Sequence, residues 1–143
     1  MRKIGWFSLA AALIATSTSA QGPEPFQPVG TMGQIMTSMV YPAANDLLLA
    51  VYRGGPKTDN EWAALQRSAV LLGESGNVLM MRGHALDQGA WMKEARTLVD
   101  VGAAASKAIG AKDSAGLTAL SDQLNATCVS CHKQYRRNVH PGP

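Results

Sequence analysis

The chain has 143 residues, of which 46% are hydrophobic and 16% charged, with a formal net charge of +3. This length suits one domain with a modest core and is too short for two. The thirteen Lys and Arg residues form no basic run, so nucleic acid is not an expected partner.

The N-terminus has the pattern of an export signal. Arg2 and Lys3 precede an apolar run from Ile4 to Ala15, and small residues follow as far as Ala20. This order predicts a secretory signal peptide over residues 1–20, cleaved before Gln21. The apolar run falls short of the ~20 residues that a bilayer span needs, so no stable membrane span is expected. Without Arg2 and Lys3, eleven basic residues face ten acidic ones, a formal charge near +1.

A short lead-in and a first helix follow. Residues 21–30 contain three prolines and two glycines, which predicts an extended, loosely ordered segment. From about Met32 to Arg53, apolar residues recur at steps of three and four, as on one face of a helix. Thr31 and Gln34 fit a capping box at its start. Pro42 lies inside this stretch and cannot donate to the carbonyl of Ser38, so a kink or break is expected there.

Three more helices are predicted, and no stretch alternates apolar and polar residues as a strand would. They run from a capping box of Thr58 and Glu61 to near Gly83, from about Gln88 to Gly110, and from the cap Asp113 to Asn138. The fold class is therefore all-α, and short connections favour an antiparallel, up-down-up-down four-helix bundle over residues 31–140.

The last of these helices carries Cys128-Val129-Ser130-Cys131-His132, the pattern of covalent haem attachment. Positions 128, 131 and 132 share one face of a helix. Two thiols can therefore add to the two vinyl groups of one porphyrin while the next imidazole faces its iron. One covalent haem c is expected, with His132 as the proximal ligand.

Other interpretations of the two cysteines fit less well. A disulfide between them would close a loop too short to stabilise much. A thioredoxin-like pair belongs at the start of a helix that follows a strand, and this pair lies near a helix end. A zinc site would need four ligands, with His84 or His140 added to the two thiols and His132. A thiol oxidoreductase would require both cysteines to be free.

The motif continues as Lys133-Gln134-Tyr135-Arg136, and on the last of four helices it resembles the class II cytochromes c, cytochrome c′ and its low-spin relatives. The resemblance implies a periplasmic bundle that exchanges single electrons with redox partner proteins, and it allows a homodimer through the first two helices. It also implies that Tyr135 lies against the ring or its rim. Arg136 could neutralise a haem propionate.

The resemblance assigns the other side of the iron to the first helix, which in this family supplies a methionine or leaves the iron five-coordinate. Met32, Met36 and Met39 are the candidates. Met36 is preferred because it lies about one turn into the helix and precedes Pro42. Methionines at helical spacing also pack in cores, and without a methionine ligand the haem would bind a small gas such as nitric oxide or carbon monoxide.

Several residues are assigned weaker roles. Cytochrome c′ carries a basic residue before a glutamine early in this helix, whereas here Gln34 stands alone. His84 is a rival distal ligand, although a lone histidine beside Gly83 more often caps a helix in solvent. Trp62 and Trp91 are expected to pack in the core or at the haem edge. Interior glycines cost about 1 kcal/mol each relative to alanine, and three of them are expected to mark close approach of a helix or the haem: Gly73, Gly76 and Gly102.

No acid, base or nucleophile constellation accompanies the motif. Electron transfer without substrate turnover is therefore the expected role, and gas binding is the alternative.

Overall fold

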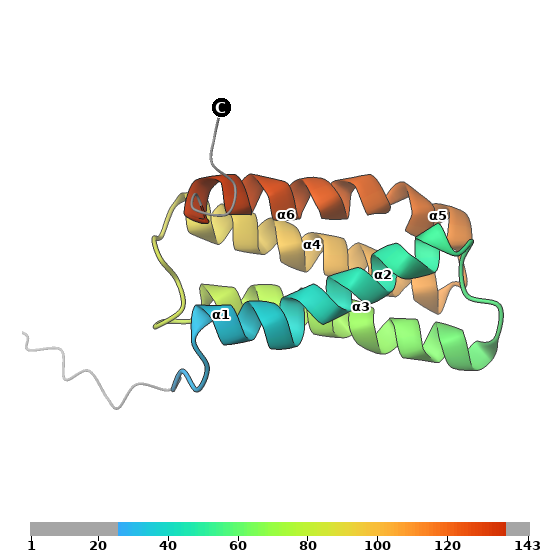
Figure 1. The fold of residues 1–143 in the computed structure, drawn as a ribbon, viewed down its shortest axis with the longest axis horizontal. Coiled ribbons are helices and arrows are strands. Elements are labelled where there is room, and N and C mark those ends of the chain that lie inside the picture. Colours follow the sequence, from blue (N-terminus) through green and yellow to red (C-terminus); the bar gives the residue numbers. More distant parts are fainter. Residues whose placement is uncertain (1–25, 137–143) are drawn as a thin grey trace, which may run out of the picture.

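The computed structural model describes residues 26–136, so the predicted signal peptide over residues 1–20, His140 and Asn138 lie outside the described residues. Within that range the chain is helical and contains no strand, which confirms the all-α class. The elements, labelled as in Figure 1, are α1 (Met32–Ile35), the π-helical turn η1 (Met36–Val40), α2 (Tyr41–Tyr52), α3 (Asp59–Met80), α4 (Ala90–Gly110), α5 (Ser114–Ala119) and α6 (Ser121–Tyr135).

The first helix begins as predicted, and its α-helical hydrogen bonding is interrupted directly before Pro42. The backbone N–H of Gln34 donates to the Thr31 hydroxyl at 3.3 Å, and the Thr31 N–H donates to the Gln34 side chain at 2.8 Å. Pro42 is the second residue of α2, and the chain neither breaks nor stops there. A π-helical turn precedes it instead, in which the Tyr41 N–H bonds to the Met36 carbonyl five residues back.

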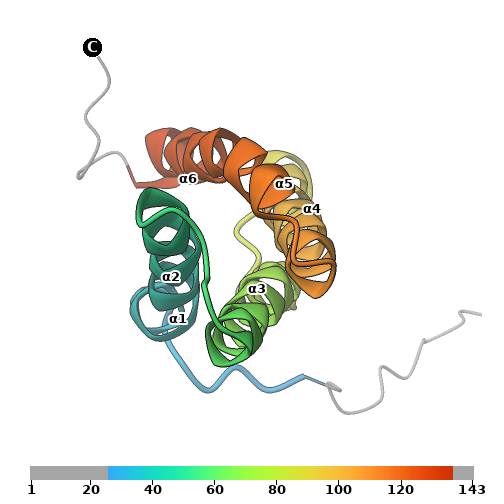
Figure 2. The same cartoon turned by 90° about the vertical axis from the view of Figure 1, so that its right-hand side faces the viewer.

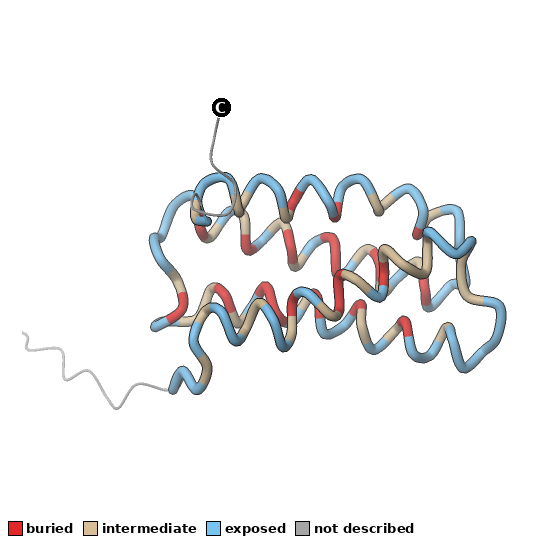
Figure 3. The backbone as a smooth tube through the Cα atoms, viewed as in Figure 1, coloured by how far each residue is buried: buried red, intermediate tan, exposed pale blue. Residues whose placement is uncertain are grey.

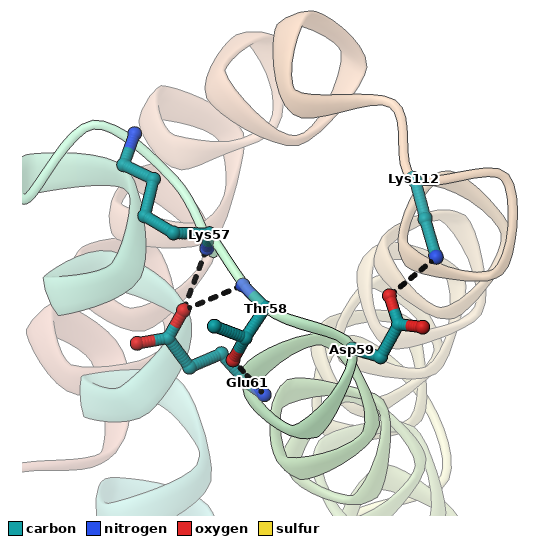
Figure 4. Close-up of polar contacts among 5 residues, drawn as sticks. All are labelled: Lys57, Thr58, Asp59, Glu61 and Lys112. Atoms are coloured by element: carbon teal, nitrogen blue, oxygen red, sulfur yellow. Dashed lines mark hydrogen bonds and ion pairs between the residues drawn. The ribbon is translucent and has the colours of Figure 1, made fainter.

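The second helix, α3, starts with the capping box that the sequence predicts (Figure 4). The Glu61 N–H donates to the Thr58 hydroxyl at 3.3 Å, and the Glu61 carboxylate accepts from the N–H groups of Lys57 at 2.6 Å and Thr58 at 2.9 Å. Nearby, the ammonium of Lys112 lies 2.7 Å from the carboxylate of Asp59 and links the loop after α4 to the start of α3. Both side chains are exposed, so this ion pair adds little stability.

Helices α3 and α4 approach each other most closely at the three interior glycines. A Cβ atom at Gly102 would lie 2.5 Å from the Cα of Gly73, and one at Gly76 would lie 2.8 Å from the carbonyl oxygen of Ala95. The glycines therefore mark helix–helix contact, one of the two outcomes expected of them.

The predicted fourth helix is two helices, α5 and α6, that meet at Leu120. Asp113 caps α5 as expected, with its carboxylate accepting from the Gly116 N–H at 2.9 Å. At the break, the Ser121 hydroxyl donates to the Thr118 carbonyl at 2.8 Å.

The helices surround one apolar interior. Viewed end-on, α2, α3, α4 and α6 lie around a common centre (Figure 2), and the buried positions follow the inward side of each helix (Figure 3). Every helix from α2 to α6 contributes to this core, which includes Leu47, Leu72, Trp91, Val101, Leu117 and Leu124. Within residues 26–136, none of the helices combines the length and apolar character needed to cross a bilayer.

The loop after α3 corrects one expectation. His84 is 6% exposed, so it is a buried side chain rather than a solvated cap. Gly83 beside it has a φ of +92°, and a Cβ there would collide with the ring of Pro28. The lead-in residue Pro28 therefore packs against this loop, although its neighbour Val29 is almost fully exposed.

Candidate functional site

A cavity of about 300 Å³ lies beside the core, within the ~300–1,000 Å³ range of ligand pockets. Its lining residues come from η1 and α2, from α3 and α4, and from α6. Most of its lining side chains are apolar. Five of the six site residues named from the sequence line it: Met36, Cys128, Cys131, His132 and Arg136.

The α6 wall carries the two cysteines and the histidine. Both thiols are partly buried and neither is in a disulfide. Burial raises the pKa of the Cys128 thiol, and burial together with the negative charge of Glu94 raises that of Cys131 to about 11. Redox-active thiols depend on a lowered pKa, so these surroundings do not favour thiolate chemistry.

The η1 wall carries one of the three candidate methionines. Met36, the first residue of the π-helical turn, is partly buried and lines the cavity together with Val40, Ala44 and others of the α2 face. Met32 and Met39 are also partly buried, but they are not among the cavity-lining residues. The structure thus brings Met36 and the cysteine–histidine motif to one cavity from opposite ends of the described chain.

Tyr135 lies outside the cavity lining and contacts it through Trp91. The two rings meet edge-to-face, with centroids 4.9 Å apart and planes at 85°. The Tyr135 hydroxyl donates to the carboxylate of Asp87. Partial burial is the larger cause, and this hydrogen bond the next, of a pKa of Tyr135 that is raised to about 12. Trp91 itself is 3% exposed, lines the cavity, and donates its indole N–H to the Leu79 carbonyl at 2.7 Å.

Asp87 has a second role that the sequence analysis missed. Its carboxylate accepts from the N–H of Gly89 at 2.8 Å and of Trp91 at 3.1 Å, and so caps α4. Hydrogen bonds from Tyr135 and from these N–H groups hold the pKa of Asp87 below its usual range. An Asp two residues before a glycine at a helix start was the signal for this cap.

Glu94 is a second residue that the sequence analysis missed. It is partly buried, lines the cavity, and accepts a 2.8 Å hydrogen bond from the hydroxyl of Ser130, a residue within the cysteine motif. The signal was a carboxylate one turn after Trp91 and next to Ala95, within the apolar stripe of α4. Glu94 thus joins α4 to the motif.

The cavity gathers several possible ligand groups. Two thiols, an imidazole and a thioether line it together with many apolar side chains, and the exposed Arg136 is also among its lining residues. In the described part of the chain, no three His, Cys, Asp or Glu side chains gather in a way that could hold a metal ion. His84, which a zinc site would recruit, is not among the residues lining the cavity.

Comparison with family models, curated proteins and solved structures found no match to this chain.

Proposed function

We propose that this chain is a periplasmic, mono-haem c-type cytochrome that carries single electrons. In this proposal one haem c is bound covalently through Cys128 and Cys131, with His132 as the proximal ligand and Met36 as the distal ligand. The observation that carries it is the cavity that these four residues line together. Its helices are proposed to form an antiparallel, up-down-up-down bundle.

Each wall of the cavity would have a separate task. Cys128 and Cys131 of α6 would hold the porphyrin through two thioether bonds, and Trp91, Ala95 and Leu98 of α4 would supply apolar surface for it. Such walls exclude water from the metal and lower the local dielectric constant, both of which tune a reduction potential. The bound haem would supply the one-electron chemistry.

The Met36 thioether is suited to an electron carrier. It is a soft ligand that stabilises ferrous iron and so raises the reduction potential. A bound methionine also closes the sixth position, so a substrate or gas would have no open site on the metal.

Arg136 and Tyr41 lie where the cavity opens to solvent. Both line it, and Tyr41 is 67% exposed, so the cavity reaches the surface at these residues. Arg136 is placed to neutralise a propionate, and an exposed haem edge here would serve redox partner proteins. The proposal also includes a homodimer formed by the first two helices, and its sole basis is the resemblance to class II cytochromes c.

The alternative is a five-coordinate haem that binds nitric oxide or carbon monoxide. The apolar character of Val40, Ala44 and Leu48 on the α2 wall favours it, because such a wall offers no strong ligand. It requires that the Met36 thioether does not reach the iron.

The covalent attachment is tested on the protein secreted with a c-type maturation system. Under denaturing conditions, the intact mass should exceed that of the polypeptide by one haem. Cys128→Ser and Cys131→Ser should each leave a single thioether, and the double variant should lose the haem on denaturation. A denatured wild-type protein with the bare polypeptide mass would contradict the proposal.

The distal ligand is tested with matched methionine variants. Met36→Ala should convert a low-spin spectrum to a high-spin one, whereas Met39→Ala on the same helix should leave the spectrum unchanged. A high-spin spectrum in the unsubstituted protein would favour the gas-binding alternative.

A further inference from the structure

The helix that carries Met36 has an irregularity directly beside it. The Tyr41 N–H bonds to the Met36 carbonyl, five residues back, where an α-helix would use the residue four back. This π-helical turn accommodates one residue more than an α-helical ladder. Such turns are rare and often occur at functional sites.

Pro42 is the physical cause that the chain offers for this turn. In a continuous α-helix, the proline ring would clash with the carbonyl of Ser38, and that carbonyl would lose its donor. Wider π-helical hydrogen bonding just before the proline relieves the clash without breaking the helix. In Figure 1, the chain accordingly passes from α1 to α2 without a loop, although the helix changes direction between them.

The extra residue changes which side chain faces the cavity. Each residue turns an α-helix by about 100°. Besides Met36 and Thr37, the positions of η1 and α2 that line the cavity span one face of an α-helix. The centre of that face lies about 70° from Val40 on this scale, and its members are Val40, Tyr41, Ala44, Asn45 and Leu48. In an uninterrupted α-helix, Met36 would lie about 110° from that centre, and Thr37 only about 10° from it.

One inserted residue rotates Met36 to within about 10° of the centre of the face. Thr37, inside the π-helical turn, lines the cavity as well. Met39 would lie about 170° from the centre in an α-helix, and one inserted residue shifts it by at most about 100°, which leaves it off the face. With the same inserted residue, Met32 comes within about 50° of the centre of the face, but it lies ~6 Å further along the helix axis than Met36. This agrees with a cavity lined by Met36 and not by Met32 or Met39.

We infer that Pro42 is a positioning residue, which maintains the π-helical turn and thereby presents the Met36 thioether to the cavity. This inference rests on the proposed function for the role of the thioether as an iron ligand. The rotation of Met36 follows from the backbone alone.

The test uses Pro42→Ala, in which the helix can return to an α-helical ladder and rotate Met36 off the cavity face. Alanine favours helix, so the variant should fold, and thermal unfolding would check this. The low-spin spectrum should be lost in Pro42→Ala. It should return when Met36→Ala and Thr37→Met are added to Pro42→Ala, because the thioether then occupies the α-helical cavity position.

A second readout does not depend on the iron. In protein with ¹³C-labelled methionine methyl groups, NOEs from Met36 to cavity-lining side chains should be present with Pro42 and lost in Pro42→Ala. A low-spin spectrum and unchanged NOEs in Pro42→Ala would overturn the inference and leave the proposed function standing. A Met36→Ala variant that remains low-spin would instead overturn the assignment of Met36 as ligand, and the inference with it.

Discussion

Replacing Gly102 with alanine tests whether the close contact of α3 and α4 holds this fold together. The new Cβ would lie 2.5 Å from both the Cα and the N of Gly73 and 3.2 Å from the carbonyl oxygen of Ala69. Carbon atoms pack at about 3.5–4.0 Å, so the helices must separate by about 1 Å. All three obstructing atoms belong to the backbone of α3, and none can move away by side-chain rotation.

Overpacking of this kind costs about 1–3 kcal/mol, and a backbone obstruction belongs at the upper end. Alanine recovers about 1 kcal/mol of helix propensity, so Gly102→Ala should lower the free energy of unfolding by about 2 kcal/mol. Gly73→Ala is the matched control, since its Cβ would meet its nearest atoms at an ordinary 3.7 Å. It should be neutral or stabilising by up to about 1 kcal/mol.

Urea unfolding, followed by far-UV circular dichroism in one haem state, measures both glycine variants. If Gly102→Ala is as stable as the unsubstituted protein, or Gly73→Ala loses as much, the packing argument is wrong.

Three further predictions concern pH and capping. The pKa of Tyr135 is raised to about 12. Folding stability should therefore fall as the pH rises from about 10, the ordinary pKa of tyrosine, towards 12. Alkaline unfolding of Tyr135→Phe should not show this loss. The pKa of Asp87 is lowered, so its contribution should be present above about pH 4 and lost below it, with Asp87→Asn flattening that acid dependence. Thr58→Ala should cost about 1 kcal/mol in urea unfolding; Thr118→Ala, which removes no cap, should cost clearly less, and equal losses would contradict the capping role.

Local signals in the sequence were sufficient for much of the fold. The capping pairs Thr31–Gln34 and Thr58–Glu61, and the cap Asp113, work through hydrogen bonds within three residues, so neighbouring residue types determine them. The division of the last helix at Leu120 was not anticipated. The apolar spacing of that helix continues across the break, so periodicity gave no signal for it.

The part of the site that could be predicted from the sequence is the part whose residues lie in one short segment. Cys128, Cys131 and His132 share a helical face through their spacing alone, so their place on one cavity wall could be expected. The choice of Met36 among three methionines could not be derived from helical spacing. It depends on a π-helical turn that changes the angular position of every residue before it.

Tertiary partners could not be anticipated either. His84 lies in a loop without periodicity, so nothing in its neighbourhood indicated its burial. The Tyr135–Asp87 and Ser130–Glu94 hydrogen bonds join α6 to residues on and before α4, far away in sequence. Such contacts follow from helix packing, which single-sequence periodicity does not specify.

The most direct measurement is the visible absorption spectrum of the purified, secreted protein, oxidised and reduced, before and after carbon monoxide is added. A low-spin reduced haem spectrum that carbon monoxide leaves unchanged is the expected result. A protein that carries no haem, or a high-spin haem that binds carbon monoxide at once, would contradict it.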